Sequence, residues 1–530
     1  MILATATGNQ RFPGSPVADW AVLLSVFFGS FGWLIYYAPA LDFLVSSVDQ
    51  GSQMTLGIAL LAGRVQGIDI VWVYGPLVGW ASALGLKFAP GYTGEVVICA
   101  FGYALSLTIM AGILLRRVPL LAVLAAVLLT ALLLSRFYKW YYWFFPLLQL
   151  ALCLGWRQCL GQTRAEAGIL FIWGLSGGIA FLFRPDLGAL SLGLFAVIWA
   201  VSLAESSRGS SRVAASRLGS FVAGYALVQA TWIALYGFEA WLGFIVGFAA
   251  SLTSAVVDAG QKPTAFRVAF AIQSTALLVI QVGLPCLAAA TIWVIIRGLW
   301  RGRRIDAYRS ALLVTALVSL GVYPQAMHRA DAQHLLQVIP PFILLLSLLA
   351  FVPGVRLSLR LLVALMLPPL LILVGAGRVD LDFRQRDFSQ YWATVAGLPY
   401  SFRGHPSADM AAAIMERTDP ADGIYTPMRL TPSPVLVMAG RYMTGLYLVH
   451  FPTYLEAGPW AARHREAVLR SDPKYLLVLR QEWTGNFNPL IPPFDVELLR
   501  RWHHDYSIVV YENRLFQLLA RPAAMPAADG

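Results

Sequence analysis

Long apolar runs alternate with short polar segments over the first 376 residues of the chain. A run of about 17 or more apolar residues lets a helix cross a hydrocarbon core about 30 Å thick. The pattern therefore predicts a mainly α membrane protein with about eleven transmembrane helices. The predicted spans are residues 17–38, 94–115, 118–134, 141–156, 168–183, 187–203, 218–236, 270–296, 310–324, 336–353 and 360–376.

Residues 39–93, between the first two spans, form a predicted external loop. Two apolar stretches within it, 51–62 and 73–88, are predicted to be helices that lie on the membrane surface. The second is short and is interrupted by Gly75 and Pro76, which is unfavourable for a crossing. The span at 310–324 is also short for a crossing and is the weakest of the eleven.

The pattern changes after residue 376, where hydrophobicity drops and short β and α segments follow. We expect a helix at 408–416 and strands at 475–479 and 507–511, the last turning through Glu512 and Asn513 into 514–519. The chain is thus predicted to have two domains: a polytopic membrane domain, 1–376, and a small soluble α/β domain, 377–530.

Composition agrees with a membrane protein, since 58% of the 530 residues are hydrophobic and 13% are charged. The net charge of +11 is explained by arginines in the loops between spans, so we expect no nucleic-acid partner. The first span follows no signal-peptide pattern and is expected to be retained. Packing is the expected role of the four cysteines, which lack metal-ligand spacing. They are Cys99, Cys153, Cys159 and Cys286.

Arginines are concentrated in alternate loops, and the other loops hold about half as many basic residues. By the positive-inside rule the arginine-rich loops are cytoplasmic. The N-terminus is then cytoplasmic and residues 377–530 are extracytoplasmic, in a multi-pass protein of the cell inner (plasma) membrane. The arginines are Arg116, Arg117, Arg157, Arg164, Arg208, Arg212, Arg217, Arg297, Arg301, Arg303, Arg304, Arg309, Arg356 and Arg360.

This topology gathers charged residues from five parts of the chain on the external side. A charge at the membrane rim is costly unless it is paired or hydrated, so such a group indicates a water-filled site. The residues are Asp49, Asp69, Arg136, Lys139, Arg184, Asp186, His328, Arg329, Asp331 and His334.

The external loop provides two candidate acids for the site, Asp49 and Asp69. Asp49 lies near the start of the external loop, after the first span, and is followed by Gln50. It is either a catalytic acid or the N-cap of the next helix. Asp69 is either a second catalytic or structural acid, or a residue that accepts hydrogen bonds from backbone amides of the loop.

The cations have alternatives of their own. Arg184 and Asp186 flank Pro185, either as a helix-ending turn whose charges neutralise one another or as part of a site. Arg136 and Lys139 lie among aromatic residues that are typical of an interfacial belt, but both could also bind a phosphate.

His328, Arg329, Asp331 and His334 form a compact external group. The two histidines lack the i, i+4 spacing that would place both on one helix face for zinc, so no metal is expected there. Donors for a phosphate or pyrophosphate fit better, with Arg329 as a forked donor. The remaining alternative is an interfacial loop with no further role.

Short motifs in the external loop resemble those of polytopic glycosyltransferases of the GT-C type, which use a polyprenyl-phosphate-linked sugar as donor. Arg184-Pro185-Asp186, the histidine group and the C-terminal domain are similar to features of bacterial members. Gln50 stands where the family often has a second acid, so no cofactor is expected, with a divalent metal as the alternative. The loop motifs are Asp49-Gln50-Gly51, Gly63-Arg64, Asp69 and Tyr74-Gly75-Pro76-Leu77.

The resemblance implies transfer of a sugar from a polyprenyl-phosphate donor to a cell-envelope glycan, lipid or protein on the outer face. Asp49 would be the base and Asp69 a second acid. Donor phosphate would be held by Arg136, Lys139, Arg184, His328, Arg329 and His334. A single displacement would invert the anomeric centre, whereas retention needs a carboxylate nucleophile. Two other classes remain open: a lipid or glycan transporter or flippase, and a non-enzymatic subunit for envelope assembly.

The orientation is testable with reporter fusions. Fusions after Arg117, Arg217 and Arg304 are expected to report a cytoplasmic location, and fusions after Lys262 and Arg378 an external one. A cytoplasmic signal at Arg378 would contradict the external placement of both the C-terminal domain and the charged group.

Overall fold

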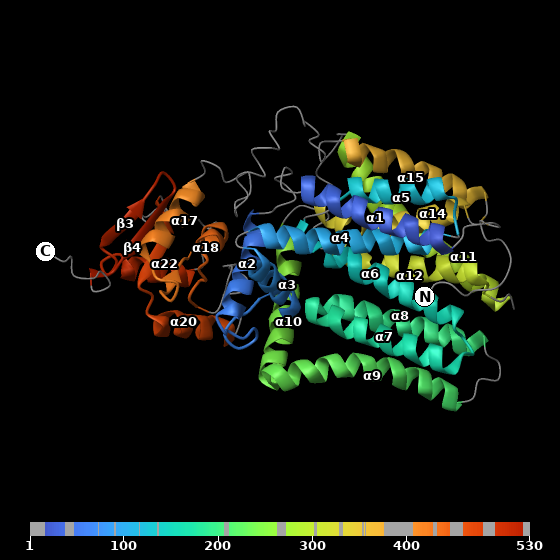
Figure 1. The fold of residues 1–530 in the computed structure, drawn as a ribbon, viewed down its shortest axis with the longest axis horizontal. Coiled ribbons are helices and arrows are strands. Elements are labelled where there is room, and N and C mark those ends of the chain that lie inside the picture. Colours follow the sequence, from blue (N-terminus) through green and yellow to red (C-terminus); the bar gives the residue numbers. More distant parts are fainter. Residues whose placement is uncertain are drawn as a thin grey trace. The chain divides into compact units, whose positions relative to one another are not determined.

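The computed structural model is predominantly helical (Figure 1). It divides into two compact units: unit 1 comprises Met1–Tyr36, Cys99–Trp232 and Val257–Gln385, and unit 2 comprises Tyr37–Ile98, Ile233–Val256 and Arg386–Gly530. The described residues are 16–37, 47–72, 74–89, 92–115, 117–134, 137–205, 211–261, 272–301, 305–327, 332–351, 355, 357–375, 406–427, 432–445, 459–480 and 493–522.

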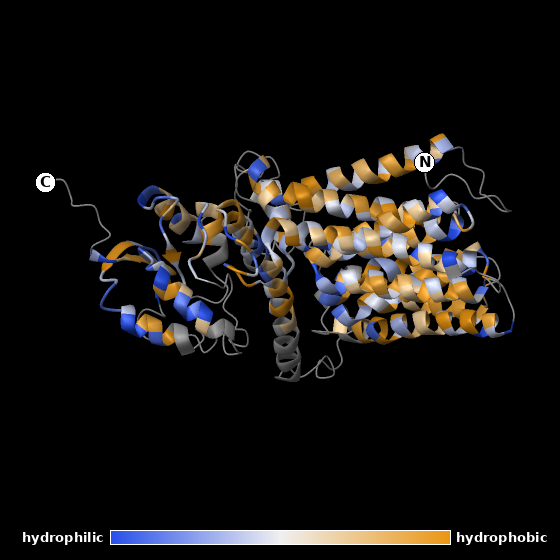
Figure 2. Ribbon diagram, turned by 90° about the horizontal axis from the view of Figure 1, so that it is seen from below, coloured by the Kyte–Doolittle hydropathy of each residue, from blue (hydrophilic) through white to orange (hydrophobic). Residues whose placement is uncertain are grey.

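Each of the eleven predicted spans coincides with a helix. Within the described residues, seven of these helices are long and apolar enough to cross a membrane, namely α1, α4, α7, α8, α9, α11 and α12. Figure 2 shows apolar residues along them, and the protein is a multi-pass membrane protein. The eleven are α1 (Pro16–Tyr37), α4 (Tyr92–Leu114), α5 (Leu120–Leu132), α6 (Tyr141–Gln158), α7 (Thr163–Phe183), α8 (Pro185–Glu205), α9 (Ser211–Tyr236), α11 (Ile272–Trp300), α12 (Ala307–Met327), α14 (Ile339–Phe351) and α15 (Leu357–Gly375).

Two helices differ from the expected pattern. The weakest predicted span lies within α12, which has 21 residues because the helix continues through polar residues at both ends of the apolar run. Helix α10 (Phe238–Gln261) lies between the predicted spans 218–236 and 270–296, where no helix was predicted. Its sequence contains an apolar run without charged residues at 240–257, so the hydropathy pattern was present and the prediction overlooked it.

Glycines and a buried polar network hold helices α6 to α9 together in unit 1. A Cβ at Gly174 in α7 would overlap the carbonyl oxygen of Phe221 in α9, so the two backbones meet only because the residue is glycine. Between α6, α7 and α8, Gln149 donates to Ser176 (3.0 Å) and accepts from Ser191 (2.8 Å). Such contacts fix the register of helices that apolar packing alone leaves free to slide.

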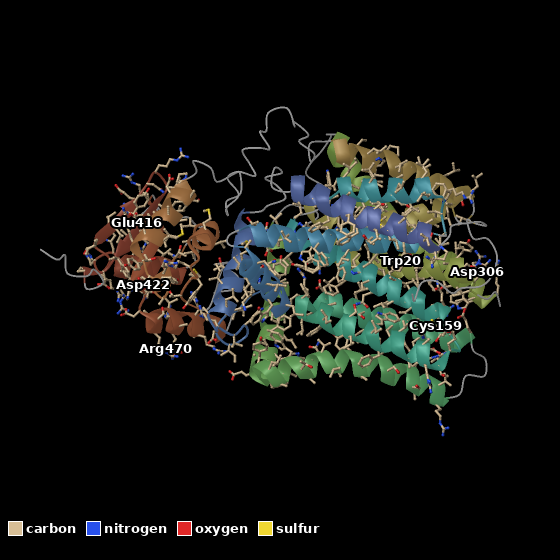
Figure 3. All side chains as sticks on the ribbon, viewed as in Figure 1. Trp20, Cys159, Asp306, Glu416, Asp422 and Arg470 are labelled. Atoms are coloured by element: carbon tan, nitrogen blue, oxygen red, sulfur yellow. The ribbon has the colours of Figure 1, made fainter. Side chains whose placement is uncertain are left out.

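Ion pairs mark one end of the unit 1 helices. Arg157, near the end of α6, donates to Glu205 at the end of α8 (2.6 Å) and to Ser310 at the start of α12 (3.2 Å). Figure 3 labels two neighbours of this end, Cys159 and Asp306. Arg157 belongs to the arginine set predicted to be cytoplasmic. The start of α6 and the end of α7 form the opposite end, and which side of the membrane each end faces stays a prediction.

Unit 2 begins with the two helices expected on the membrane surface, α2 (Ser47–Leu61) and α3 (Pro76–Phe88). They cross closely at Gly57, where a Cβ would lie 2.8 Å from the backbone nitrogen of Ala83. In the same unit Met54 of α2 and Val437 form a buried apolar cluster. The described part of the segment 39–93 is therefore largely helical, and α2 packs against C-terminal residues.

The C-terminal part of unit 2 contains a four-stranded sheet in the order β1-β2-β4-β3. The expected hairpin is confirmed: Asn513 accepts hydrogen bonds from the backbone N–H of Leu515 and of Phe516, which closes the turn between β3 and β4. The strands are β1 (Ile424–Tyr425), β2 (Tyr475–Leu479), β3 (Ile508–Glu512) and β4 (Phe516–Ala520), and the helices are α17 (Pro406–Arg417), α18 (Pro432–Ala439), α20 (Pro459–Ser471) and α22 (Pro493–Trp502).

The two units are not the two predicted domains. Unit 2 joins the external loop and part of α10 to the C-terminal sheet. Compactness in space does not test which segment folds on its own, so the predicted division between 1–376 and 377–530 stays a prediction.

Candidate functional site

The turn between α7 and α8 presents the first pair of candidate residues. Arg184 adopts an extended conformation (φ −163°, ψ 126°) while its N–H still donates to the carbonyl of Ala180 (2.7 Å). Pro185 explains this geometry, because a residue before proline is pushed out of the helical region and proline is favoured at the first position of a helix. The sequence Arg-Pro-Asp thus ends one helix and starts the next within a single residue.

Arg184, Asp186 and Gln325 form a closed hydrogen-bonded triangle. The Nε of Arg184 donates to Asp186 (2.9 Å), and its Nη2 donates to Oε1 of Gln325 near the end of α12 (3.0 Å). The amide of Gln325 in turn donates to the second oxygen of Asp186. This triangle fixes the plane of the guanidinium group and ties α12 to the α7–α8 turn.

Tyr142, at the start of α6, brings Lys139 beside Arg184. The guanidinium carbon of Arg184 lies 5.1 Å from the centre of the Tyr142 ring, and Nζ of Lys139 lies 5.9 Å from the same centre. Lys139 also lies 5.5 Å from the ring centre of Tyr138. Because Lys139 is only 5% exposed, these ring faces stabilise a charge that water scarcely reaches.

His334 lies in the short helix α13 (Ala332–Gln337) and is partly buried. The indole N–H of Trp143, next to Tyr142, donates to the carbonyl of Leu336 in this helix (3.0 Å). The structure therefore places α13 beside the start of α6, where the cations gather. Arg136, His328, Arg329 and Asp331 lie outside the described residues.

The acids belong to unit 2, where Asp49 lies in the first turn of α2. The described residues do not include its side chain. Gln50, beside it, is fully buried, and neither polar atom of its side chain has a hydrogen-bond partner among the described residues. Gln53, one turn further on, donates to Ser82 and to the buried carboxylate of Glu95 in α4 (both 3.2 Å). Asp49 thus precedes a buried polar cluster.

Asp69 holds the loop after α2 together. Its Oδ2 accepts from the backbone N–H of Val65 (2.8 Å), and its own N–H donates to the Val65 carbonyl (2.8 Å). Gly67, between them, has a φ of +93°, and a Cβ there would overlap the carbonyl oxygen of Ala240 in α10. The structure thus shows that Asp69 accepts a hydrogen bond from a backbone amide of the loop, which was one of the two alternatives for this residue. A catalytic role for Asp69 stays a prediction.

Sequence reasoning missed three residues of these clusters: Tyr142, Gln325 and Glu95. Tyr142 stood in an aromatic run and Gln325 beside a proline, with nothing to mark their contacts across the chain. Glu95 did carry a signal, because an acid at the start of an apolar span is costly and so indicates a specific environment.

Comparison with solved structures identifies the fold. ArnT from Cupriavidus metallidurans in the apo state aligns with a TM-score of 0.52 and 15% identity over 96% of this chain and 98% of that one. The same protein bound to undecaprenyl phosphate gives 0.51 and 13% over 96% and 99%. An Archaeoglobus fulgidus oligosaccharyltransferase tethered with an acceptor peptide gives 0.42 and 15% over 91% and 72%.

No protein-family model matches the chain, and no curated protein matches it by sequence. ArnT is a GT-C glycosyltransferase. The fold that the chain shares with ArnT confirms the predicted architecture, a mainly helical membrane protein with a small sheet near its C-terminus.

The role of Asp69 is testable with two substitutions. Asp69→Asn retains an oxygen that accepts from the Val65 N–H, so amide exchange at Val65 is expected to stay within about threefold of wild type. Asp69→Ala removes the acceptor, and exchange there is expected to rise about tenfold. Sugar transfer that falls in Asp69→Asn without faster exchange would show that the charge acts in the reaction; unchanged transfer would show a structural role alone.

Proposed function

We propose that the protein is a membrane glycosyltransferase that moves a sugar from a polyprenyl-phosphate donor to a glycan, lipid or protein of the cell envelope. One observation carries the proposal: Lys139 and Arg184 gather on Tyr142 at one end of a helix bundle. The bundle has the fold of ArnT, a protein that has been solved with undecaprenyl phosphate bound. We take the outer face of the membrane as the side of transfer.

The proposed role of the cations is to hold the departing phosphate. A sugar linked to phosphate needs no general acid, since positive charge stabilises the leaving group directly. Arg184 is oriented by Asp186 and Gln325, and Lys139 provides a compact charge in a site of low exposure, where electrostatic attraction is strong. We propose His334 as a further donor, together with Arg136, His328 and Arg329.

The proposed base is Asp49. The acceptor oxygen would attack C1 of the sugar while the bond from C1 to the phosphate oxygen breaks. The phosphate would take the bonding electrons and the carboxylate of Asp49 the acceptor proton. One displacement of this kind inverts the configuration at C1. Asp69 is the less favoured base, because one of its oxygens already binds the Val65 amide.

The direct test is an assay with membranes that contain the protein and a panel of labelled polyprenyl-phosphate sugars. Transfer of label from at least one of them to envelope material, with release of polyprenyl phosphate, is expected. Movement of intact lipid-linked sugar across the bilayer without cleavage would instead identify a flippase. Binding without either event would indicate an assembly subunit.

The phosphate site is testable through Lys139. The substitution Lys139→Met keeps an unbranched stem and removes the charge, so affinity for undecaprenyl phosphate is expected to fall about 10- to 100-fold. Arg164→Met is the matched control, since Arg164 is an exposed cation near the opposite end of α7. Equal affinities for Lys139→Met and the control in a direct binding assay would place the phosphate elsewhere.

The base is testable through Asp49→Asn, which preserves shape and is also a good N-cap residue. The variant is expected to express normally and to bind donor normally, while transfer falls about 10²- to 10⁴-fold, the usual contribution of a positioned proton acceptor. Transfer at wild-type rate by the purified, folded variant would show that Asp49 is only a cap.

A further inference from the structure

Arg64 connects the loop that carries Asp69 with the C-terminal part of unit 2. Its Nη1 donates to the carbonyl of Met443 (3.1 Å), and its Nη2 donates to the carbonyls of Gly445 (2.7 Å) and Asp69 (2.6 Å). The guanidinium carbon also lies 5.6 Å from the centre of the Tyr442 ring. A single side chain thus binds three backbone carbonyls from two segments almost 400 residues apart.

Only arginine suits this arrangement. The carbonyls approach from two segments, and a guanidinium presents five N–H donors in a fixed plane, whereas a lysine ammonium is a compact point charge. Burial lowers the pKa of Arg64, and the nearby carboxylate of Asp69 opposes that shift. Arginine stays charged in proteins even so. Its hydrogen bonds are therefore charge-assisted and partly buried, which makes them stronger than neutral ones.

Both partners of Arg64 are anchored independently. On the loop side, the Gly67 N–H donates to the Ile70 carbonyl (2.8 Å), so the turn is closed on itself. On the C-terminal side, the Thr444 N–H donates to the carbonyl of Ile424 in strand β1 (2.9 Å). Arg64 therefore joins a closed turn to a segment fixed on the sheet.

Apolar contacts surround the same junction. Tyr442 packs on a buried cluster that includes Leu56 of α2 and Ile70 and Trp72 of the loop. Met54 of α2 and Val437 of α18 form a second contact of this kind. Helix α2, which carries Asp49, and the turn that carries Asp69 are both held against the C-terminal part of unit 2.

We propose that Arg64 is a positioning residue, and that the C-terminal domain is the platform that holds the acidic loop in its working conformation. The proposal rests on the proposed function, because the loop carries the acids assigned to sugar transfer. Arg64 acts through the loop. Its loss therefore slows transfer while donor binding, assigned to Lys139 and Arg184, is unchanged.

Hydrogen exchange of the full-length protein tests the link without any activity. Arg64→Ala is expected to speed exchange of the Gly67 and Asp69 amides, and of the Thr444 amide across the junction, by about tenfold or more. Arg64→Lys is expected to fall between wild type and alanine. The matched control is Arg417→Ala, since Arg417 also donates to a backbone carbonyl, that of Val510, within the C-terminal part of the chain. Wild-type exchange of the loop in Arg64→Ala would overturn the proposal.

A second variant approaches the junction from the other side. Gly445 has a φ of +104°, and a Cβ there would lie 2.9 Å from Cγ2 of Val468, so Gly445→Ala displaces the carbonyl that Arg64 binds. If the two residues act through one link, amide exchange in the loop of the double variant Arg64→Ala/Gly445→Ala is no faster than in whichever single variant exchanges faster. If the double variant instead shows the product of the two single increases in the rate of loop exchange, Arg64 and Gly445 act separately and the proposed link is wrong.

Activity completes the test. Arg64→Ala is expected to lower kcat for transfer at least about tenfold with unchanged affinity for undecaprenyl phosphate, and Arg64→Lys to recover part of that loss. Faster loop exchange with wild-type kcat would overturn the positioning role. A wild-type protein that transfers no sugar would refute the proposed function, and the exchange result would still decide whether Arg64 holds the loop.

Discussion

The packing of two cations, one buried and one partly buried, over a single tyrosine ring is the constraint on which one end of unit 1 depends. Lys139 and Arg184 lie over the Tyr142 ring, and Arg184 is held by Asp186 and Gln325. A cation in a weakly hydrated place is costly unless carboxylates, amides or ring faces compensate for the lost water. These partners come from α6, α8 and α12, so the contacts of the two cations tie the ends of three helices together.

In unit 2, the corresponding contacts hold the turn that carries Asp69. Asp69 binds its own turn, Gly67 lies against α10, and Arg64 fastens the turn to the C-terminal part. The cations assigned to the phosphate belong to unit 1, and the proposed base, Asp49, belongs to unit 2. The sheet of unit 2 anchors the segment that Arg64 binds, since the Thr444 N–H donates to the carbonyl of Ile424 in β1.

Local patterns predicted most of the fold. The apolar runs predicted the eleven helices, and the Glu512-Asn513 turn predicted the C-terminal hairpin. Both kinds of element depend on residues that are close together in the sequence. Helix α10 was overlooked although its sequence contains an apolar run without charged residues at 240–257, and β1 was not predicted because two residues carry no pattern. The candidate residues were predicted by charge and position, but contacts such as Arg184 with Gln325 join residues 141 apart in sequence, which no local pattern records.

A density map of the protein bound to undecaprenyl phosphate tests the proposed phosphate site most directly. We expect density for the phosphate within hydrogen-bond distance, about 2.7–3.2 Å, of Lys139 Nζ and of the Arg184 guanidinium, beside the Tyr142 ring. A phosphate bound away from both cations, with Lys139 and Arg184 still packed on Tyr142, would contradict the proposed site and leave these residues with a structural role alone.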